Sequence, residues 1–185
     1  METMILGLAI FFAIHLLPSV PTLRNALFIG LGEKAYKGLY ALIAFAGLYF
    51  IVTGKGQAEY IDMWEPATWS YVVTNVSMIV ALYCIVAMHM KSNIKRFTAH
   101  PMLWGITAWS CGHLFTNGDK ASIVLFGSFL VYSLVAMYSA NRRGARPHDR
   151  KVSFRYDAMI AVISTVIYVV LANLHPYFTG MELVR

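Results

Sequence analysis

Charged side chains are scarce in this sequence: Asp, Glu, Lys and Arg make up only 13% of its 185 residues, while hydrophobic residues make up 58%. Soluble domains carry about 25% charged residues, so this chain has too few charges to cover a water-exposed surface. An aromatic content of 14% excludes a disordered chain, and two cysteines are too few for a disulfide scaffold. We therefore expect an integral membrane protein.

The sequence also lacks the motifs of several common enzyme and transport classes. It has no P-loop, no GxSxG and no HExxH motif, no paired carboxylates inside a hydrophobic run, and no arginine spacing typical of a voltage sensor. Cys84 and Cys111 form no CxxC pair. A zinc site needs three or four ligands at one depth, so we do not expect one here.

The hydrophobic runs predict an all-α, polytopic transmembrane helical bundle of about six helices. A spanning helix needs ~20 mostly apolar residues. The expected segments are 4–17 (continuing through a kink at Pro18 towards Arg24), 35–53, 69–90, 101–116 and 120–140, and a sixth from after Asp157 to His175-Pro176. We expect one transmembrane domain over residues 1–185, with the last basic loop and the sixth helix in 141–185.

The basic residues predict the orientation of this bundle. All Lys and Arg residues except Lys55, Lys120 and Arg185 lie in the first, third and fifth connections or at the adjoining helix ends. The positive-inside rule then places both termini on the non-cytoplasmic side. The basic stretch 141–155 is short and juxtamembrane, so it indicates anionic lipid headgroups and not a nucleic acid as its neighbour.

His15 and His113 are the ionisable residues most deeply placed in hydrophobic runs. Their helical neighbours are apolar or aromatic, and an unpaired imidazole there costs a few kcal/mol, so each needs a partner. One turn before each histidine lies an aromatic residue, and a further turn back lies a glycine (Phe11 and Gly7; Trp109 and Gly105). Such a face admits a large flat ring, although glycines also serve plain helix packing.

Two neutral imidazoles from two helices are a usual way to hold a haem iron, with cations for the haem propionates. His15 and His113 are therefore candidate axial ligands, and Arg24 or the Lys95–Arg96 pair are candidate propionate contacts. A rise of ~1.5 Å per residue places His15 ~17 Å below the outer start of its helix and His113 ~5 Å from the outer end of its own. A shared haem requires the first helix to begin lower or the fourth to tilt.

Several segments, in this order, resemble the NnrU family. They are 15–19 (HLLPS) with Leu23-Arg24, 32–40 (GEKAYKGLY), 100–105 (HPMLWG), 109–114 (WSCGHL) and 117–119 (NGD). The resemblance covers most of the chain through about Ala140. It adds His100, Trp109, Asn117 and Asp119 as further candidate site residues, with His100 either bracing a helix end or serving the site.

The resemblance implies a multi-pass protein of the bacterial inner (cytoplasmic) membrane, in a family named for its association with nitrite and nitric oxide reduction. The family is also similar to plastid zeta-carotene isomerases, membrane proteins that use haem b to isomerise a cis double bond. Their haem-ligating histidines match His15 and His113 by motif position. Those isomerases carry a Gly/Ala-rich segment after the first histidine, where this chain has Pro18 and Pro21.

Three functions follow as hypotheses. The first is a haem b protein ligated by His15 and His113 and linked to denitrification redox physiology. The second is an isomerase acting on a carotenoid-like polyene, in which ferrous haem lends electron density to the double bond. The third is a non-catalytic membrane partner for reductase assembly that holds no cofactor. The expected partners are the lipid bilayer and either a lipophilic substrate or a redox partner, and whether the chain is an enzyme stays open.

Overall fold

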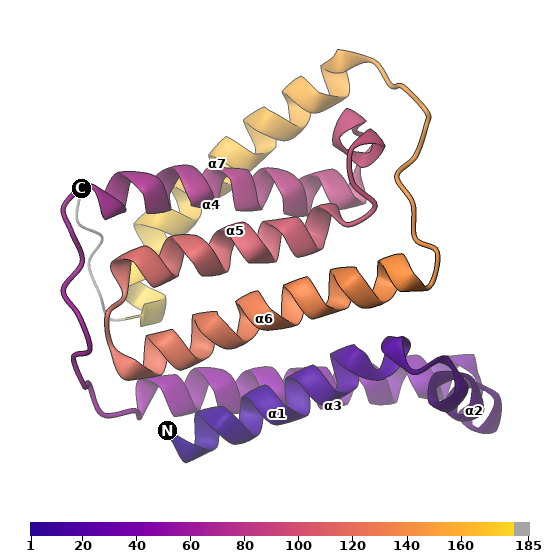
Figure 1. The fold of residues 1–185 in the computed structure, drawn as a ribbon, viewed down its shortest axis with the longest axis horizontal. Helices are drawn as coiled ribbons and strands as arrows, with labels where there is room; N and C mark the ends of the chain where they lie inside the picture. The colour runs from indigo at the N-terminus through magenta and orange to yellow at the C-terminus, as the bar shows by residue number, and fades with distance from the viewer. Residues whose placement is uncertain (180–185) are drawn as a thin grey trace. The chain divides into compact units, whose positions relative to one another are not determined.

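A computed structural model describes residues 1–179, and over this range the regular secondary structure is helical apart from one isolated bridge between Asp62 and Asp119 (Figure 1). The predicted class, an all-helical membrane protein, is confirmed. The chain forms two compact units, Met1–Ile61 and Asp62–Arg185, called here the N-terminal and C-terminal units. The predicted side of the C-terminus concerns residues 180–185, which lie outside the described range.

The N-terminal unit holds three helices, α1 (Glu2–Leu16), α2 (Pro21–Leu31) and α3 (Glu33–Gly56). α1 packs antiparallel along α3 at glycines, which let the two backbones approach closely. A Cβ added at Gly7 would lie 2.5 Å from the nitrogen of Ile51, and one at Gly47 would lie 2.9 Å from the nitrogen of Phe11. Both glycines therefore serve helix packing, which for Gly7 is the plainer of the two roles considered in the sequence.

The prediction of one kinked helix reaching Arg24 is wrong. α1 ends at Leu16, a 3₁₀ turn η1 covers Leu17–Ser19, and a separate helix α2 begins at Pro21. Val20 between them is non-helical (φ −118°, ψ 80°), because a residue before proline is driven out of the α region. α1 begins at Glu2, so it forms with η1 an 18-residue apolar segment that is long enough to cross a membrane without α2.

The C-terminal unit is built around two central helices, α4 (Ser70–His89) and α5 (Pro101–Thr116) (Figure 1). α6 (Lys120–Arg142) packs on α5, and α7 (Phe154–Thr179) packs on α4. A short 3₁₀ turn, η2 (Asn93–Arg96), lies in the α4–α5 connection. α4 and α5 run antiparallel and meet at Gly105 and Gly112, where an added Cβ would lie within 3 Å of α4 atoms.

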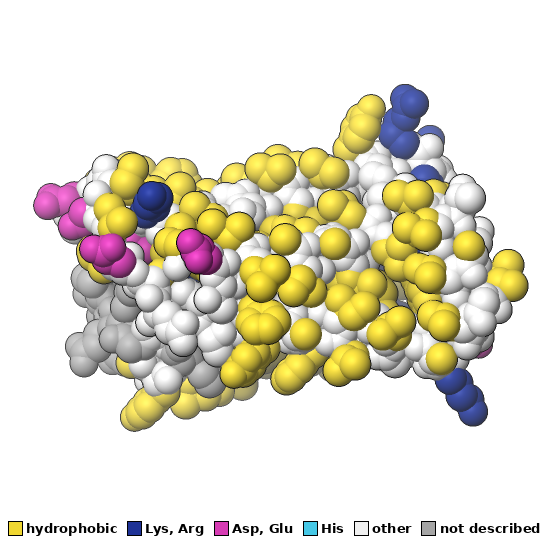
Figure 2. Space-filling view, turned by 90° about the horizontal axis from the view of Figure 1, so that it is seen from below, with side chains coloured by type: hydrophobic (Ala, Val, Ile, Leu, Met, Phe, Trp, Pro, Cys, Tyr) yellow, Lys and Arg dark blue, Asp and Glu magenta, His cyan; other side chains and the backbone are white. Residues whose placement is uncertain are grey.

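Within residues 1–179, five segments are long and apolar enough to span a membrane: Glu2–Ser19, α3, α4, α6 and the part of α7 up to Tyr177. The fourth predicted span is a helix with the expected bounds, but its 16 residues cover only ~24 Å, less than the ~30 Å hydrocarbon layer. Large hydrophobic side chains are exposed on all five segments, as a lipid-facing surface requires. Figure 2 shows hydrophobic side chains, in yellow, over much of the face that it draws.

Candidate functional site

His15 lies in the last turn of α1, and the main chain of its own helix fixes its ring. Nδ1 lies 2.7 Å from the carbonyl oxygen of Phe11, one turn earlier. The imidazole also stacks on the Phe11 ring, with centroids 3.9 Å apart and planes inclined by 25°. The histidine is half-buried. Its ring is thus held at one edge by a hydrogen bond and on one face by an aromatic plane.

His113 repeats this arrangement in the C-terminal unit, near the end of α5. Its Nδ1 lies 3.0 Å from the carbonyl oxygen of Trp109, again one turn earlier. Its ring stacks on Phe126 of α6, with centroids 4.4 Å apart and planes inclined by 28°. This histidine is half-buried as well. The two residues selected from the sequence on solvation grounds therefore share one local geometry.

The shared hydrogen bond determines the chemistry of both rings. A backbone carbonyl can only accept, so Nδ1 carries the hydrogen and donates it in each case. In the neutral imidazole the lone pair then lies on Nε2. A ligating histidine usually donates its other ring N–H to a carbonyl or carboxylate, which sets the tautomer and orients the ring. In this neutral tautomer, Nε2 is the ring nitrogen that a metal ion would bind.

Aromatic rings extend from His15 through the N-terminal unit. Tyr40 of α3 meets the imidazole edge-on, with centroids 5.6 Å apart. Tyr36 lies 6.3 Å from Tyr40, and Phe28 of α2 lies 5.6 Å from Tyr36. The guanidinium of Arg24 then lies 5.8 Å from the Phe28 centroid. The series of rings begins at the candidate ligand and ends at the candidate propionate contact.

His113 has an aromatic environment of its own. Trp109 lies 5.4 Å from the imidazole and packs edge-on against Phe126 and Phe129 of α6, at 4.9 and 5.4 Å. Trp109 thus accepts the hydrogen bond of His113 through its backbone carbonyl and also packs beside the imidazole ring. These two contacts are the structural role of this candidate residue. The sequence reasoning missed Tyr40 and Phe126, because contacts between helices leave no spacing signal within one helix.

Asn117 and Asp119 stabilise the helix ends beside His113. The Asn117 side-chain amide donates to the carbonyl oxygen of His113 at 2.9 Å, and the Asn117 backbone N–H donates to the same oxygen, so both reinforce the end of α5. The Asp119 carboxylate caps α6 by accepting from the backbone N–H of Ser122 at 2.9 Å. Gly118 between them packs so tightly on the carbonyl of Trp64 that no side chain fits. These residues hold the turn after the histidine.

His100 and Arg96 lie away from His113. His100 precedes α5, and its Nε2 lies 2.8 Å from the Asn141 side-chain oxygen at the end of α6, which is a bracing contact. Arg96 lies in η2, before the start of α5, whereas His113 follows that start by about 18 Å of helix. The structure therefore does not bring Arg96 together with His113. Arg24 is an exposed residue of α2 in the N-terminal unit.

The donor set fits a haem better than a bare metal ion. Within residues 1–179, no group of three or more His, Cys, Asp or Glu side chains could hold a metal ion. Haem iron needs only two axial ligands from the protein, since the porphyrin supplies the rest. Each of the two imidazoles lies among aromatic rings in its own unit, and imidazole is a ligand that haem iron takes.

The comparisons with known proteins agree with the segments quoted from the sequence. No curated protein and no solved structure matches the chain. A family model described as NnrU protein matches residues 3–183, which extends well beyond the resemblance that ends near Ala140. Because this match covers nearly the whole chain, the protein belongs to the NnrU family.

Proposed function

We propose that this NnrU-family membrane protein binds haem b through His15 and His113 and serves redox physiology linked to nitrite and nitric oxide reduction. One observation carries the haem proposal: each histidine donates from Nδ1 to the carbonyl four residues earlier and so presents Nε2 as a lone pair. The location that the family resemblance implies for the protein is the bacterial inner membrane.

The chain's own residues would do three things for such a haem. His15 and His113 would supply the nitrogen ligands. The rings of Phe11, Tyr40 and Phe126 would pack near the ligands and keep water away. Arg24 would offer a guanidinium to a propionate, since it is exposed and forms no ion pair among the described residues. The bound haem would supply one-electron chemistry to a partner or a lipophilic substrate.

A common haem sets a geometric condition on the two helices. His15 lies in the last turn of α1, and His113 lies one turn before the end of α5. Joint ligation requires both imidazoles to reach the same depth in the membrane. The proposal therefore predicts that both histidines, and not one alone, determine the spectrum of the haem.

Absorption spectroscopy tests this directly. The protein is expressed with haem supply, purified in detergent and recorded oxidised and reduced, as wild type and as His15→Ala and His113→Ala. His148→Ala is the matched control, because His148 is exposed in the α6–α7 connection. We expect a Soret band in wild type and control, and a lost or shifted band with reduced haem content in both ligand variants. Helical circular dichroism checks that each variant is folded.

The other outcomes decide between the alternatives. A folded wild-type protein without a Soret band would rule out the haem proposal. The remaining hypothesis would then be the third one, a non-catalytic membrane partner for reductase assembly that holds no cofactor. A band that changes in only one variant would show ligation by that histidine alone. If haem is present, a polyene-producing host tests the isomerase: a changed cis/trans ratio on expression supports it, and an unchanged ratio favours the redox role. α1 ends one residue after His15, at the proline-containing turn that distinguishes this chain from the isomerases.

A further inference from the structure

Two basic segments of the C-terminal unit are held together at one end of its helices. The first runs from Lys91 through η2 to Arg96, and the second runs from Arg150 to Arg155 at the start of α7. The backbone N–H of His148 donates to the carbonyl of Lys95 at 2.8 Å and joins the two connections. Segments that are far apart in the sequence thus form one basic surface.

A buried carboxylate fixes this surface. Asp157 is 8% exposed, and one of its oxygens accepts from the Ser92 hydroxyl and the Asn93 backbone N–H, both at 2.9 Å, and from Tyr83 at 3.2 Å. The Asn93 amide donates to the other oxygen at 2.5 Å. Asn93 also exchanges two hydrogen bonds with the backbone of Val152, at 2.9 and 3.1 Å. The carboxylate is therefore satisfied by neutral donors.

The cations around Asp157 are consequently left without an acidic partner. Among the described residues the only ion pair joins Lys37 to Glu33, in the N-terminal unit. Lys91, Arg96, Arg150, Lys151 and Arg155 are all exposed, and the exposed carboxylate of these connections is Asp149. Like charges held side by side repel, so an external anion would stabilise this arrangement.

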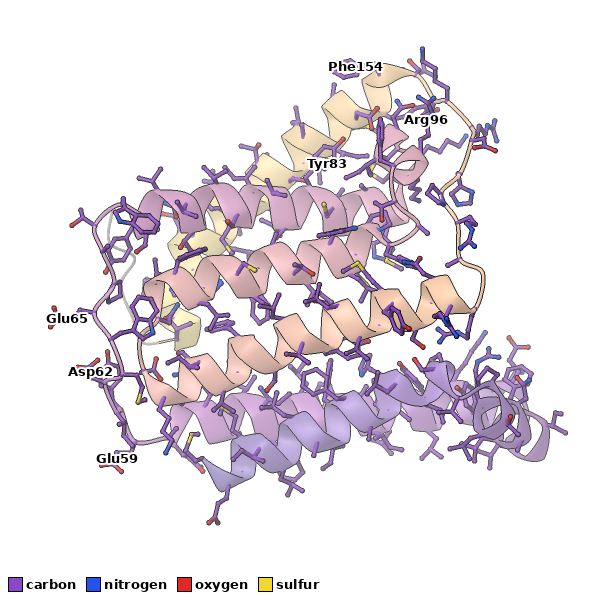
Figure 3. All side chains as sticks on the ribbon, viewed as in Figure 1. Glu59, Asp62, Glu65, Tyr83, Arg96 and Phe154 are labelled. Atoms are coloured by element: carbon purple, nitrogen blue, oxygen red, sulfur yellow. The ribbon has the colours of Figure 1, made fainter. Side chains whose placement is uncertain are left out.

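Exposed aromatic side chains accompany these cations. Phe97 and Phe154 are 80% and 78% exposed, although each adjoins the basic segments. Tyr156 lies between Lys91 and Arg155, whose charged groups are 5.8 and 5.2 Å from its ring centroid. Figure 3 shows Arg96 and Phe154 at one end of the C-terminal unit, with Asp62 and Glu65 at the other. Aromatic rings beside Lys and Arg at the ends of spanning helices are typical of the membrane–water interface.

We propose that this basic surface is a binding site for the headgroup of an anionic phospholipid. Basic residues next to a spanning helix attract anionic headgroups, and the two Phe rings would lie against the acyl chains of the same lipid. A soluble phosphate or a nucleic acid would leave those rings in water. The Asp157 hydrogen bonds orient the segments before the lipid arrives, which reduces the ordering cost of binding.

Binding of fluorescently labelled phosphatidylglycerol to the full-length protein in detergent tests the site, with phosphatidylcholine of the same acyl chains as the uncharged comparison. The test variant is Arg96→Gln with Arg155→Gln. The charge-matched control is Lys55→Gln with Lys120→Gln, which removes two cations elsewhere. We expect phosphatidylglycerol to bind more tightly than phosphatidylcholine and the test variant to bind it about thirtyfold more weakly than wild type. The control variant is expected to retain wild-type affinity.

The remaining outcomes would overturn the proposal. Equal losses in the test and control variants would indicate general electrostatic attraction without a site. Unchanged binding in a folded test variant, or equal binding of the two lipids, would show that these cations do not select the headgroup. Competition by inorganic phosphate at the concentration of the lipid would identify a phosphate site in its place. Haem content is measured in parallel, so that a failure of the haem proposal is distinguished from a failure of the lipid site.

Discussion

Gly54 lies where the backbone of α3 meets the backbone of α1. A Cβ placed there would collide with the main chain of Met4, and a backbone cannot rotate away as a side chain can. The nearby Gly7 and Gly47 make the same kind of contact. These glycines decide how closely α1 and α3 approach, and through that approach they set the position of His15.

We predict that Gly54→Ala lowers the free energy of unfolding by about 1–3 kcal/mol or more, because the added methyl group overpacks a backbone contact. Thermal unfolding in detergent, followed by circular dichroism, measures the effect. Gly38→Ala in the same helix is the control, since none of the described atoms lies within 4 Å of its added Cβ. The control is expected to be neutral or stabilising, because Ala is the better helix former. Equal losses in both variants would contradict the packing argument.

Single residues also show how far the sequence could define the site. His15 and His113 stood out because imidazoles in apolar runs need partners. The partners themselves were not foreseeable in full: each Nδ1 bonds within its own helix, whereas the stacking ring of His113 comes from Phe126 on another helix. The buried role of Asp157 was missed for the same reason, since its donors come from residues at least 64 positions away.

At the scale of helices and turns, the positions of the helix ends are harder to predict from the sequence than the presence of the helices. The fourth helix has the expected bounds, because Pro101 and Asn117-Gly118 are strong start and stop signals. The last helix begins at Phe154, before the expected position, since Asp157 in its first turn is buried and accepts hydrogen bonds from Ser92 and Asn93 in the α4–α5 connection. The break at Val20 was underestimated because two prolines close together act jointly on the backbone between them.

The start of α6 gives a prediction at this scale. Asp119→Ala removes the side chain that caps Ser122, so we expect a stability loss of about 1 kcal/mol, with fraying of the helix that carries Phe126. Asp119→Asn keeps an oxygen that can accept the same hydrogen bond and is expected to retain most of the stability. Thermal unfolding of the two variants beside wild type measures the difference. Similar losses in both would mean that the charge matters more than the cap.

At the scale of the whole molecule, the distribution of charge predicts the orientation in the membrane. In the C-terminal unit, Asp62 and Glu65 lie at the end opposite to Arg96 and Phe154 (Figure 3). The exposed cations Arg142, Arg143, Arg146 and Arg150 lie in or beside the α6–α7 connection. The positive-inside rule predicts that the side of the helices with the excess of Lys and Arg faces the cytoplasm.

Reporter fusions test that orientation. We expect alkaline phosphatase fused after Arg185 to be active, because it folds only outside the cytoplasm, and the same reporter fused after Gly144 to be inactive. Green fluorescent protein at the two positions is the reciprocal control, and it should fluoresce only after Gly144. Activity of the phosphatase at Gly144 and not at Arg185 would reverse the predicted sides. Phosphatase activity at both positions would mean that α7 does not cross the membrane.

The hydrogen bonds of His15 and His113 end on main-chain oxygens, and this has a consequence for sequence variation. No substitution of Phe11 or Trp109 can remove the acceptor, since every residue type carries the same carbonyl. Relatives of this chain can therefore exchange the aromatic residues one turn before each histidine and still keep the proton on Nδ1. Only a substitution that unwinds the helical turn before the histidine would break the hydrogen bond of Nδ1.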